Sequence, residues 1–391
     1  MKTGSRKALA LIVKREWRIL LSRPLYPFVM IVAPLLCMLF FTTLLHEGQP
    51  EKMPTGVVDC DNSATSRKVI RTLDAFQHIN IVKKYASVTD ARRDVQEGHI
   101  YGFFYFPEHF GEDATAQRRP TLSFYVSYTY LIAASMLYQN MKTMAELTGA
   151  SAVLTTLTAK GATYDQAMNF VQPISIDKHP LQNPWLNYSV YLNNTLVPGL
   201  ISLLIFLMTS FSVSSEVKRG TSRELLRLSH FSIVRALFAK LLPQTLVWVG
   251  MMLFCNFTFY ELLAFPHNSG ILPMIAASLL LVLASQGMGL LFFAIVPQVR
   301  FCMAMCSLWG VVSISICGFT YPIMAMYPAI QGLSLLFPLR YFHMIYCDQA
   351  LNGLPLLYSW TSYVALAVFA LLPLLLVRRI KYSYMYDQYM P

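Results

Sequence analysis

Side chains that could bind a metal or act in catalysis are few in this sequence, and their spacing is poor. Asp59, Asp61 and Ser63 alternate like the first oxygen ligands of a calcium loop, but no glycine stands at position six of that loop and no glutamate at position twelve. A turn followed by a capped helix explains the same residues better. Four histidines lack the spacing of paired metal ligands: His78, His99, His109 and His179. The sequence therefore predicts no metal site.

Catalytic and nucleotide-binding motifs are also missing from the sequence. The chain contains no GxSxG or HExxH pattern and no Gly-Lys dipeptide, without which a phosphate-binding P-loop cannot form. The seven cysteines are scattered and form no CxxC pair, so neither a disulfide framework nor a zinc site is indicated. Gly287 and Gly289 lie inside an apolar run, where we interpret them as helix-packing positions. We expect no catalytic residue, no metal and no cofactor bound by this chain.

The composition is that of a membrane protein. Hydrophobic residues make up 55% of the 391 residues and charged residues only 13%, against about 25% in soluble domains, and the mean hydropathy is +0.47. A helix needs about 20 apolar residues to cross a bilayer. Six charge-free runs have this length, at residues 26–45, 195–213, 241–260, 272–296, 301–321 and 356–377. Because these runs carry no formal charge, an ion-coupled carrier is disfavoured.

The net charge of +11 is distributed unequally along the chain. If the N-terminus is cytoplasmic, the inner segments carry 17 Lys and Arg against four acidic residues, and the rest of the chain has a net charge of −2. The inner segments are then residues 1–25, 214–240, 297–300 and 378–391. Basic residues are enriched on the cytoplasmic side of membrane proteins, so the excess indicates that both termini are cytoplasmic. The basic excess therefore does not indicate that the chain binds nucleic acid.

The segment before the first span has the pattern of an amphipathic helix over residues 7–22. Its polar face comprises Lys7, Lys14, Arg15, Arg18 and Ser22, and its apolar face comprises Leu9, Val13, Trp17 and Leu20. Such a helix lies flat on the surface of a lipid membrane. We therefore expect residues 1–25 to form a cytoplasmic interfacial helix and residues 26–45 to form the first membrane helix.

The large segment between the first two spans, residues 46–190, predicts a small α/β domain outside the membrane. Patterns of apolar and turn residues predict strands at residues 55–61, 80–85, 101–106 and 121–128. They also predict helices from Ser63 or Thr65 to about Gln77, over residues 89–97, and from Tyr130 to residue 160. Residues 191–391 hold the other five spans. The expected fold is an α-helical membrane protein of six transmembrane helices with an inserted α/β extracytoplasmic domain.

The inner segment at residues 214–240 contains the pattern of a short capped helix. Gly220 can end the preceding membrane helix, and Thr221 and Glu224 have the spacing of a capping box. A short helix at the membrane face suits the docking of another protein, whereas a solvated, positively charged loop is the simpler alternative. The candidate docking residues are Glu216, Arg219, Gly220, Thr221, Glu224 and Arg227.

The segment at residues 320–355 continues the fifth span in an unusual way. Residues 301–339 carry no formal charge, but prolines divide them into one span and pieces too short to cross the membrane. Such pieces enter the bilayer and return, which predicts a re-entrant hairpin before the last span. A proline-rich interfacial loop is the alternative. The candidate outer-gate residues are Gly318, Phe319, Tyr321, Pro322, Pro328, Pro338 and Arg340.

Several segments together resemble a known family over nearly the whole chain. They are KREWRILLSRP at residues 14–24 with its Arg15–Glu16 pair, the pattern from Glu216 to Leu226, and the Gly-Phe-x-x-Pro turn at Gly318. Residues 57–63 and 98–110 add the features of an outer domain. With these motifs the chain resembles the membrane permease subunit of ABC type 2 exporters, in the large-loop subgroup that includes bacterial multidrug and lipid exporters.

The resemblance implies a half-transporter in the bacterial plasma (inner) membrane. ATP would be bound by a separate ABC ATPase subunit that docks on the inner loop, and a second permease copy or a paralogue would complete the pathway. A periplasmic adaptor protein is a further implied partner, and re-entrant helices would close the pathway on the outside. The uncharged spans suit export of a hydrophobic or amphipathic substrate, although the same residues also suit packing against lipid.

A membrane-anchored receptor or scaffold with a ligand-sensing outer domain is the alternative interpretation. It should carry signalling motifs on the inside, whereas the inner segments are short and the C-terminal one has only 14 residues. The exporter permease is therefore the preferred hypothesis.

Overall fold

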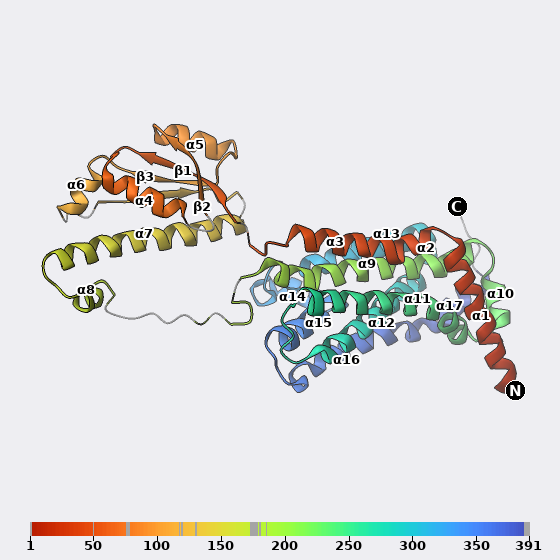
Figure 1. Cartoon of the computed structure of the whole chain (residues 1–391). Coiled ribbons are helices and arrows are strands. Elements are labelled where there is room, and N and C mark those ends of the chain that lie inside the picture. Colours follow the sequence, from red (N-terminus) through yellow and green to blue (C-terminus); the bar gives the residue numbers. More distant parts are fainter. Residues whose placement is uncertain are drawn as a thin grey trace. The chain divides into compact units, whose positions relative to one another are not determined.

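The computed structural model describes residues 2–49, 51–75, 79–116, 118, 120–129, 131–172, 179, 181–184 and 186–386. The predicted helix positions Gln77 and Tyr130, and His78, lie outside these residues. The chain divides into two compact units, one formed by Met1–Gly48 with Pro180–Pro391 and the other by Gln49–His179 (Figure 1). The first unit is a bundle of helices, and the second combines helices with a sheet.

Among the described residues, six helices of the first unit are long and apolar enough to cross a membrane, and these candidate spans match the six predicted ones. They are Leu25–Leu44, Tyr188–Lys218, Ile233–Leu262, Ile271–Ile295, Val299–Ile316 and Leu356–Tyr386. The second span extends beyond its apolar run because the helix continues to Lys218, and Gly220 ends it with a φ of +70°. This confirms the predicted role of Gly220.

The elements of the first unit follow one another along the chain. They are α1 (Lys2–Ser22), α2 (Leu25–Pro27), η1 (Phe28–Val32), α3 (Ala33–Leu44), α9 (Tyr188–Lys218), α10 (Ser222–Leu228), α11 (Ile233–Phe257), η2 (Thr258–Leu262), α12 (Ile271–Ile295), α13 (Val299–Ile316), η3 (Ile323–Ala325), α14 (Pro328–Ser334), α15 (Pro338–Ile345), η4 (Tyr346–Leu351), α16 (Leu356–Leu371), η5 (Leu372–Leu376) and α17 (Val377–Tyr386).

Helix α9 packs against α3, α12 and α13 in the bundle. Small residues let its neighbours approach closely. A Cβ atom at Gly287 would lie 2.4 Å from the carbonyl oxygen of Phe369, so α12 meets α16 backbone to backbone. A Cβ atom at Gly289 would lie 3.0 Å from the carbonyl oxygen of Phe206 on α9. The interpretation of both glycines as helix-packing positions is confirmed.

Helix α1 lies at the end of the bundle where α10 and α17 also lie (Figure 1). Ile12, Glu16 and Leu20 form its buried face, because they recur every four residues. The predicted division of faces is wrong for Arg15. Its side chain is only 23% exposed and is directed at Glu216, since an ion pair holds it against the bundle.

The second unit contains a four-stranded sheet in the order β2 (Ile79–Tyr85), β1 (Met53–Asp59), β3 (Gly102–Phe106), β4 (Ser123–Val126). Strand β1 is parallel to β2 and β3, and β4 is antiparallel to β3. Neighbouring parallel strands require crossover connections, which here are the helices α4 (Ala64–Asp74) and α5 (Val88–Gln96). The other helices are α6 (Phe110–Thr115), α7 (Leu131–Ala159) and α8 (Tyr164–Val171).

Successive side chains of a strand point to opposite faces of the sheet, and apolar side chains form a core on each face. Val57, Phe104 and Phe106 pack with residues of α4 and α7 on one face. Val58 and Phe103 pack with α5 on the other. The four predicted strands are confirmed with shifted ends, and so are the three predicted helices over their described residues, whereas α6 and α8 were not predicted.

The capped helix after β1 is also confirmed. The Ser63 hydroxyl accepts a hydrogen bond from the Ser66 amide at 3.0 Å, as an N-cap residue does. The Asp59 carboxylate accepts from the Asp61 amide at 3.2 Å, and the Asp61 carboxylate accepts from the Gly111 amide at 3.0 Å. Asp59 therefore closes the turn between β1 and α4, and Asp61 joins this turn to α6.

Candidate functional site

The predicted docking loop, residues 214–240, contains the short helix α10. Its buried residues are Ser222, Leu225 and Leu226, and its exposed residues are Arg223, Glu224 and Arg227. A helix of seven residues is not stable alone, so packing of the leucines must hold it. The helix consequently presents two arginines and one glutamate to its surroundings.

The predicted capping box at the start of α10 is wrong. Thr221 has a helical backbone, with φ −88° and ψ −4°, and its side chain makes no bond to the first turn of α10. An N-cap side chain reaches those amides from an extended backbone. The Thr221 hydroxyl instead donates a hydrogen bond of 2.5 Å to Oε2 of Glu216, and Glu224 remains exposed.

Four charged side chains from three helices form a closed ring beside this loop. Lys240 Nζ donates to Oε2 of Glu16 at 2.9 Å and to Oε1 of Glu216 at 2.8 Å. Arg15 donates to Oε1 of Glu16 at 2.8 Å and to Oε2 of Glu216 at 3.0 Å. Each of the four carboxylate oxygens therefore accepts from a cation. We call Arg15, Glu16, Glu216 and Lys240 the charged ring.

Three of the four side chains of the charged ring are almost completely removed from solvent, and that of Arg15 is 23% exposed. The side chains of Glu16 and Lys240 are each 2% exposed and that of Glu216 is 6% exposed. Buried charges are tolerated only where they are paired and hydrogen-bonded, and here two positive groups face two negative groups. Burial by itself lowers the pKa of Arg15, but the hydrogen bond to Glu216 and the charges of both glutamates outweigh it and raise this pKa.

The last helix of the chain is attached to the docking loop as well. The Ser222 hydroxyl donates to the carbonyl oxygen of Tyr384 at 2.9 Å, and Arg223 Nε donates to the carbonyl oxygen of Met385 at 2.9 Å. The hydroxyl of the buried Tyr384 donates to the carbonyl oxygen of Val213 at 3.2 Å. Helices α9, α10 and α17 therefore meet at the same end of the bundle.

An open groove of about 220 Å³ lies beside α10. It is lined by Arg223, Leu226, Arg227, Phe231, Met385 and Tyr386. His230 and Phe231 have positive φ angles of +53° and +58°, which turn the chain sharply and leave Phe231 52% exposed. Arginine and aromatic side chains around an apolar floor are typical of protein-binding surfaces.

The predicted outer segment, residues 320–355 with Gly318 and Phe319 before it, contacts the opposite end of α9. The Tyr191 hydroxyl donates to the carbonyl oxygen of Phe319. Thr195 Oγ1 lies 2.9 Å from Nδ1 of the buried His343. The segment contains the short helices α14 and α15, and each begins at one of the predicted prolines. Both are too short to cross a membrane.

The candidate gate residues occupy different environments. Phe319 and Pro338 are buried, whereas Tyr321, Pro322 and Pro328 are exposed. Gly318 has a φ of +118°, a conformation that favours glycine. Arg340 donates to the carbonyl oxygen of Gln331 at 3.1 Å and to the Ser334 hydroxyl, so it connects α15 with the C-terminal end of α14.

The structure thus combines the short helix α10, a bundle of candidate spans and an outer segment interrupted by prolines. Comparison of the sequence with protein families gives a consistent result. The family model described as ABC-2 family transporter protein matches residues 26–379. The chain belongs to the ABC-2 transporter family. A search of curated proteins finds no match.

Membership of this family confirms the predicted class of protein. The chain is a multi-pass membrane permease, a transport subunit that is not itself catalytic. ABC-2 permeases generally pair with ABC ATPase subunits, which carry the ATP.

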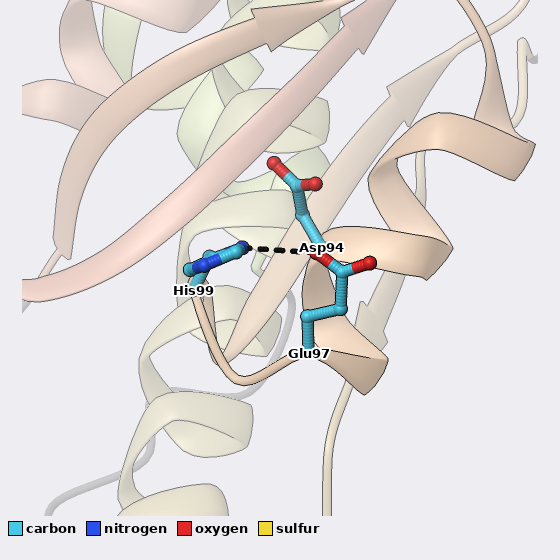
Figure 2. Close-up of side chains that lie close together, drawn as sticks. All are labelled: Asp94, Glu97 and His99. Atoms are coloured by element: carbon cyan, nitrogen blue, oxygen red, sulfur yellow. Dashed lines mark ion pairs between the residues drawn. The ribbon is translucent and has the colours of Figure 1, made fainter.

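Three side chains of the α/β unit of the permease have the separation of metal ligands. The ligand atoms of Asp94, Glu97 and His99 lie within 4.8 Å of one another (Figure 2). However, Asp94 Oδ2 already accepts from Tyr85 at 2.7 Å and from the Lys83 ammonium at 2.9 Å, and these bonds lower the pKa of Asp94. Because the lysine occupies the place of a counter-cation and two ligands are exposed, we assign no metal to this group.

Sequence reasoning missed Lys240 entirely and did not place Arg15 and Glu16 beside Glu216. A usable signal existed, because Lys240 directly precedes an uncharged span, and Glu216 closely follows one. Opposite charges at the same ends of neighbouring spans are candidates for a pair. Among the predicted docking residues, the structure brings Glu216 and Thr221 together and leaves Arg219, Glu224 and Arg227 exposed.

Proposed function

We propose that this ABC-2 permease is half of an ATP-driven exporter that moves a hydrophobic or amphipathic molecule out of the cytoplasm or the inner leaflet of a bacterial plasma membrane. The observation that carries the proposal is that the docking loop and the outer segment contact opposite ends of α9. Its 31 residues make it about 46 Å long, enough to cross a bilayer. A movement of the loop can therefore reach the outer segment through one continuous helix.

In this proposal an ABC ATPase docks on α10 and the groove beside it. Leu225 and Leu226 anchor the helix, and the exposed Arg219, Glu224 and Arg227 contact the ATPase. Charges at the rim of an interface steer association and fix the orientation of the partners. Gly220 and Thr221 form the joint between this surface and α9.

The outer segment is proposed to close the transport pathway. Pro322, Pro328 and Pro338 interrupt its backbone, and Arg340 holds the two short helices together. A re-entrant position of these helices is supported by their apolar, charge-free sequence up to Arg340. A second copy of the chain or a paralogue would supply the other wall of the pathway.

The proposed orientation places residues 1–25 and both termini in the cytoplasm, residues 26–45 in the first span, and residues 46–190 outside. The distribution of basic residues supports this orientation. An outer unit of this kind could contact a periplasmic adaptor protein. Residues 191–391 would form the rest of the membrane domain.

The proposed substrate class is supported by the polar pairs between the spans, which are neutral. Ser202 pairs with Ser285 at 2.7 Å, and Asn256 pairs with Ser278 at 3.0 Å. Neutral hydroxyl and amide groups can accommodate an amphipathic molecule without the cost of burying an unpaired charge.

Docking is tested by co-purification of the permease with its ATPase and by permease-stimulated ATP hydrolysis. The triple variant Arg219→Glu, Glu224→Ala, Arg227→Glu should lower the affinity for the ATPase at least tenfold, about 1.4 kcal/mol. Arg300→Glu reverses one arginine on another predicted inner segment and should bind normally. Normal binding and stimulation by the triple variant would assign docking to a different surface.

The orientation is tested with an impermeant thiol reagent on intact cells, in a chain whose native cysteines are replaced by serine. Cysteines placed at Lys83 or Arg118 should react, and cysteines placed at Arg219 or Lys381 should not. The reverse labelling would contradict export in the proposed direction.

A further inference from the structure

The charged ring connects three helices that are distant in the sequence. Glu16 belongs to α1, Glu216 to α9 and Lys240 to α11, and Glu16 and Lys240 are 224 residues apart. We infer that Arg15, Glu16 and Lys240 are positioning residues that clamp α1 and α11 to Glu216 at the C-terminal end of α9, beside α10, so that α1 moves with α10 during ATP-driven transport. This inference rests on the proposed function.

The geometry of the ring distinguishes it from an ordinary surface ion pair. Lys240 bridges Glu16 and Glu216 with distances of 2.9 and 2.8 Å while its own side chain is 2% exposed. A surface pair can open because water replaces the lost contact. Here an opened contact would leave a charge in a poorly solvated place, so the four groups should stay together when their helices move.

The ring reaches the docking surface through one more hydrogen bond. Glu216 Oε2 accepts from Arg15 at 3.0 Å and also from the hydroxyl of Thr221, the residue directly before α10. A displacement of α10 therefore acts on Glu216 first. From Glu216 it acts on α1 through Arg15 and on α11 through Lys240.

This arrangement gives α1 a role beyond attachment to a membrane surface. A simple anchor needs an apolar face and exposed basic residues. It does not need a glutamate buried to 2% exposure beside a lysine of another helix. The adjacent Arg15 and Glu16 bind the two opposite charges of α9 and α11, which fixes both the rotation and the height of α1 against these helices.

The test uses the full-length permease reconstituted in lipid nanodiscs with the ATPase that co-purifies with it. Glu16→Gln and Lys240→Gln each leave one net charge buried, which opposes correct folding. The test therefore uses the double variant Glu16→Gln, Lys240→Gln, which keeps the region neutral. Arg18→Gln changes an exposed charge of α1 outside the ring and is the matched control. The readouts are the amount of bound ATPase, permease-stimulated hydrolysis, and hydrogen–deuterium exchange of α1 and α10.

The amount of ATPase bound by the double variant should be within about twofold of the wild-type amount. Its rate of permease-stimulated ATP hydrolysis should be at least tenfold lower. Amide exchange in α1 should rise severalfold, even without the ATPase, and Arg18→Gln should match the wild type in every readout. Full stimulation with unchanged exchange in the double variant would overturn the clamp and leave the ring a folding element only. A wild-type permease that neither binds nor stimulates an ATPase would instead overturn the proposed function, while the exchange measurement still tests the clamp.

Discussion

The hydroxyl of Thr221 donates a 2.5 Å hydrogen bond to the carboxylate of Glu216, across the glycine turn that separates α9 from α10. This bond replaces the capping interaction that the spacing of Thr221 and Glu224 had indicated. The joint between the span and the docking helix is therefore held by a bond to a buried charge, which is stronger than a bond between neutral groups.

Thr221→Val should weaken this joint, because valine has nearly the same shape and no hydroxyl. Hydrogen bonds to charged groups contribute about 1.5–3 kcal/mol, so we expect a lower melting temperature of the purified permease and weaker stimulation of the ATPase. Thr221→Ser keeps the hydroxyl and should behave like the wild type. Equal melting temperatures of the valine and serine variants would show that the bond contributes nothing.

Pro322→Ala and Pro328→Ala should alter transport without altering assembly with the ATPase. Each substitution restores a backbone N–H group and relaxes the restriction on φ, so the short helices of the outer segment can lengthen. Transport of a lipophilic dye by cells is the measurement, and ATPase co-purification checks assembly. Pro297→Ala, in a predicted inner connection, is the control. Unchanged dye transport in both outer variants would show that this segment is only a connecting loop and does not close the pathway.

Gly287→Ala should disrupt the contact between α12 and α16. The new Cβ atom would meet the carbonyl oxygen of Phe369 at 2.4 Å, and backbone atoms cannot move aside as a flexible side chain can. Overpacking of this kind costs about 1–3 kcal/mol. Gly250→Ala meets no atom within 4 Å and should be neutral or slightly stabilising. The comparison is the melting temperature of the two variants in one detergent, and equal values would contradict the close approach.

Asp94 should make the α/β unit sensitive to acid. Its hydrogen bonds with Tyr85 and Lys83 lower its pKa below the ordinary value of 3.8. A carboxylate with a lowered folded-state pKa stabilises the fold fully above its unfolded-state pKa, and this stability is lost as the pH falls through the lowered value. Asp94→Asn should therefore be cleaved faster than the wild type by pepsin at pH near 4.5, and the difference should shrink toward pH 2. A difference that is independent of pH would contradict this assignment.

Much of the fold depends on local properties and could be predicted from the sequence. The six spans follow from runs of uncharged residues, because crossing a bilayer requires a minimum apolar length wherever the helix lies in the bundle. The strand and helix order of the α/β unit follows from short-range alternation and from signals such as the Ser63 cap. Gly220 likewise ends α9 for a local reason, its positive φ.

The charged ring could be decided only by the tertiary structure. Arg15 alone looks like one more basic residue on an amphipathic helix, and Lys240 looks like a positive residue flanking a span. Their partners become evident only when packing brings α1, α9 and α11 to the same end of the bundle. The reason is that burial of a charge depends on where its counter-charge lies in space, whereas the lengths and periods that predict helices depend only on neighbours in the chain.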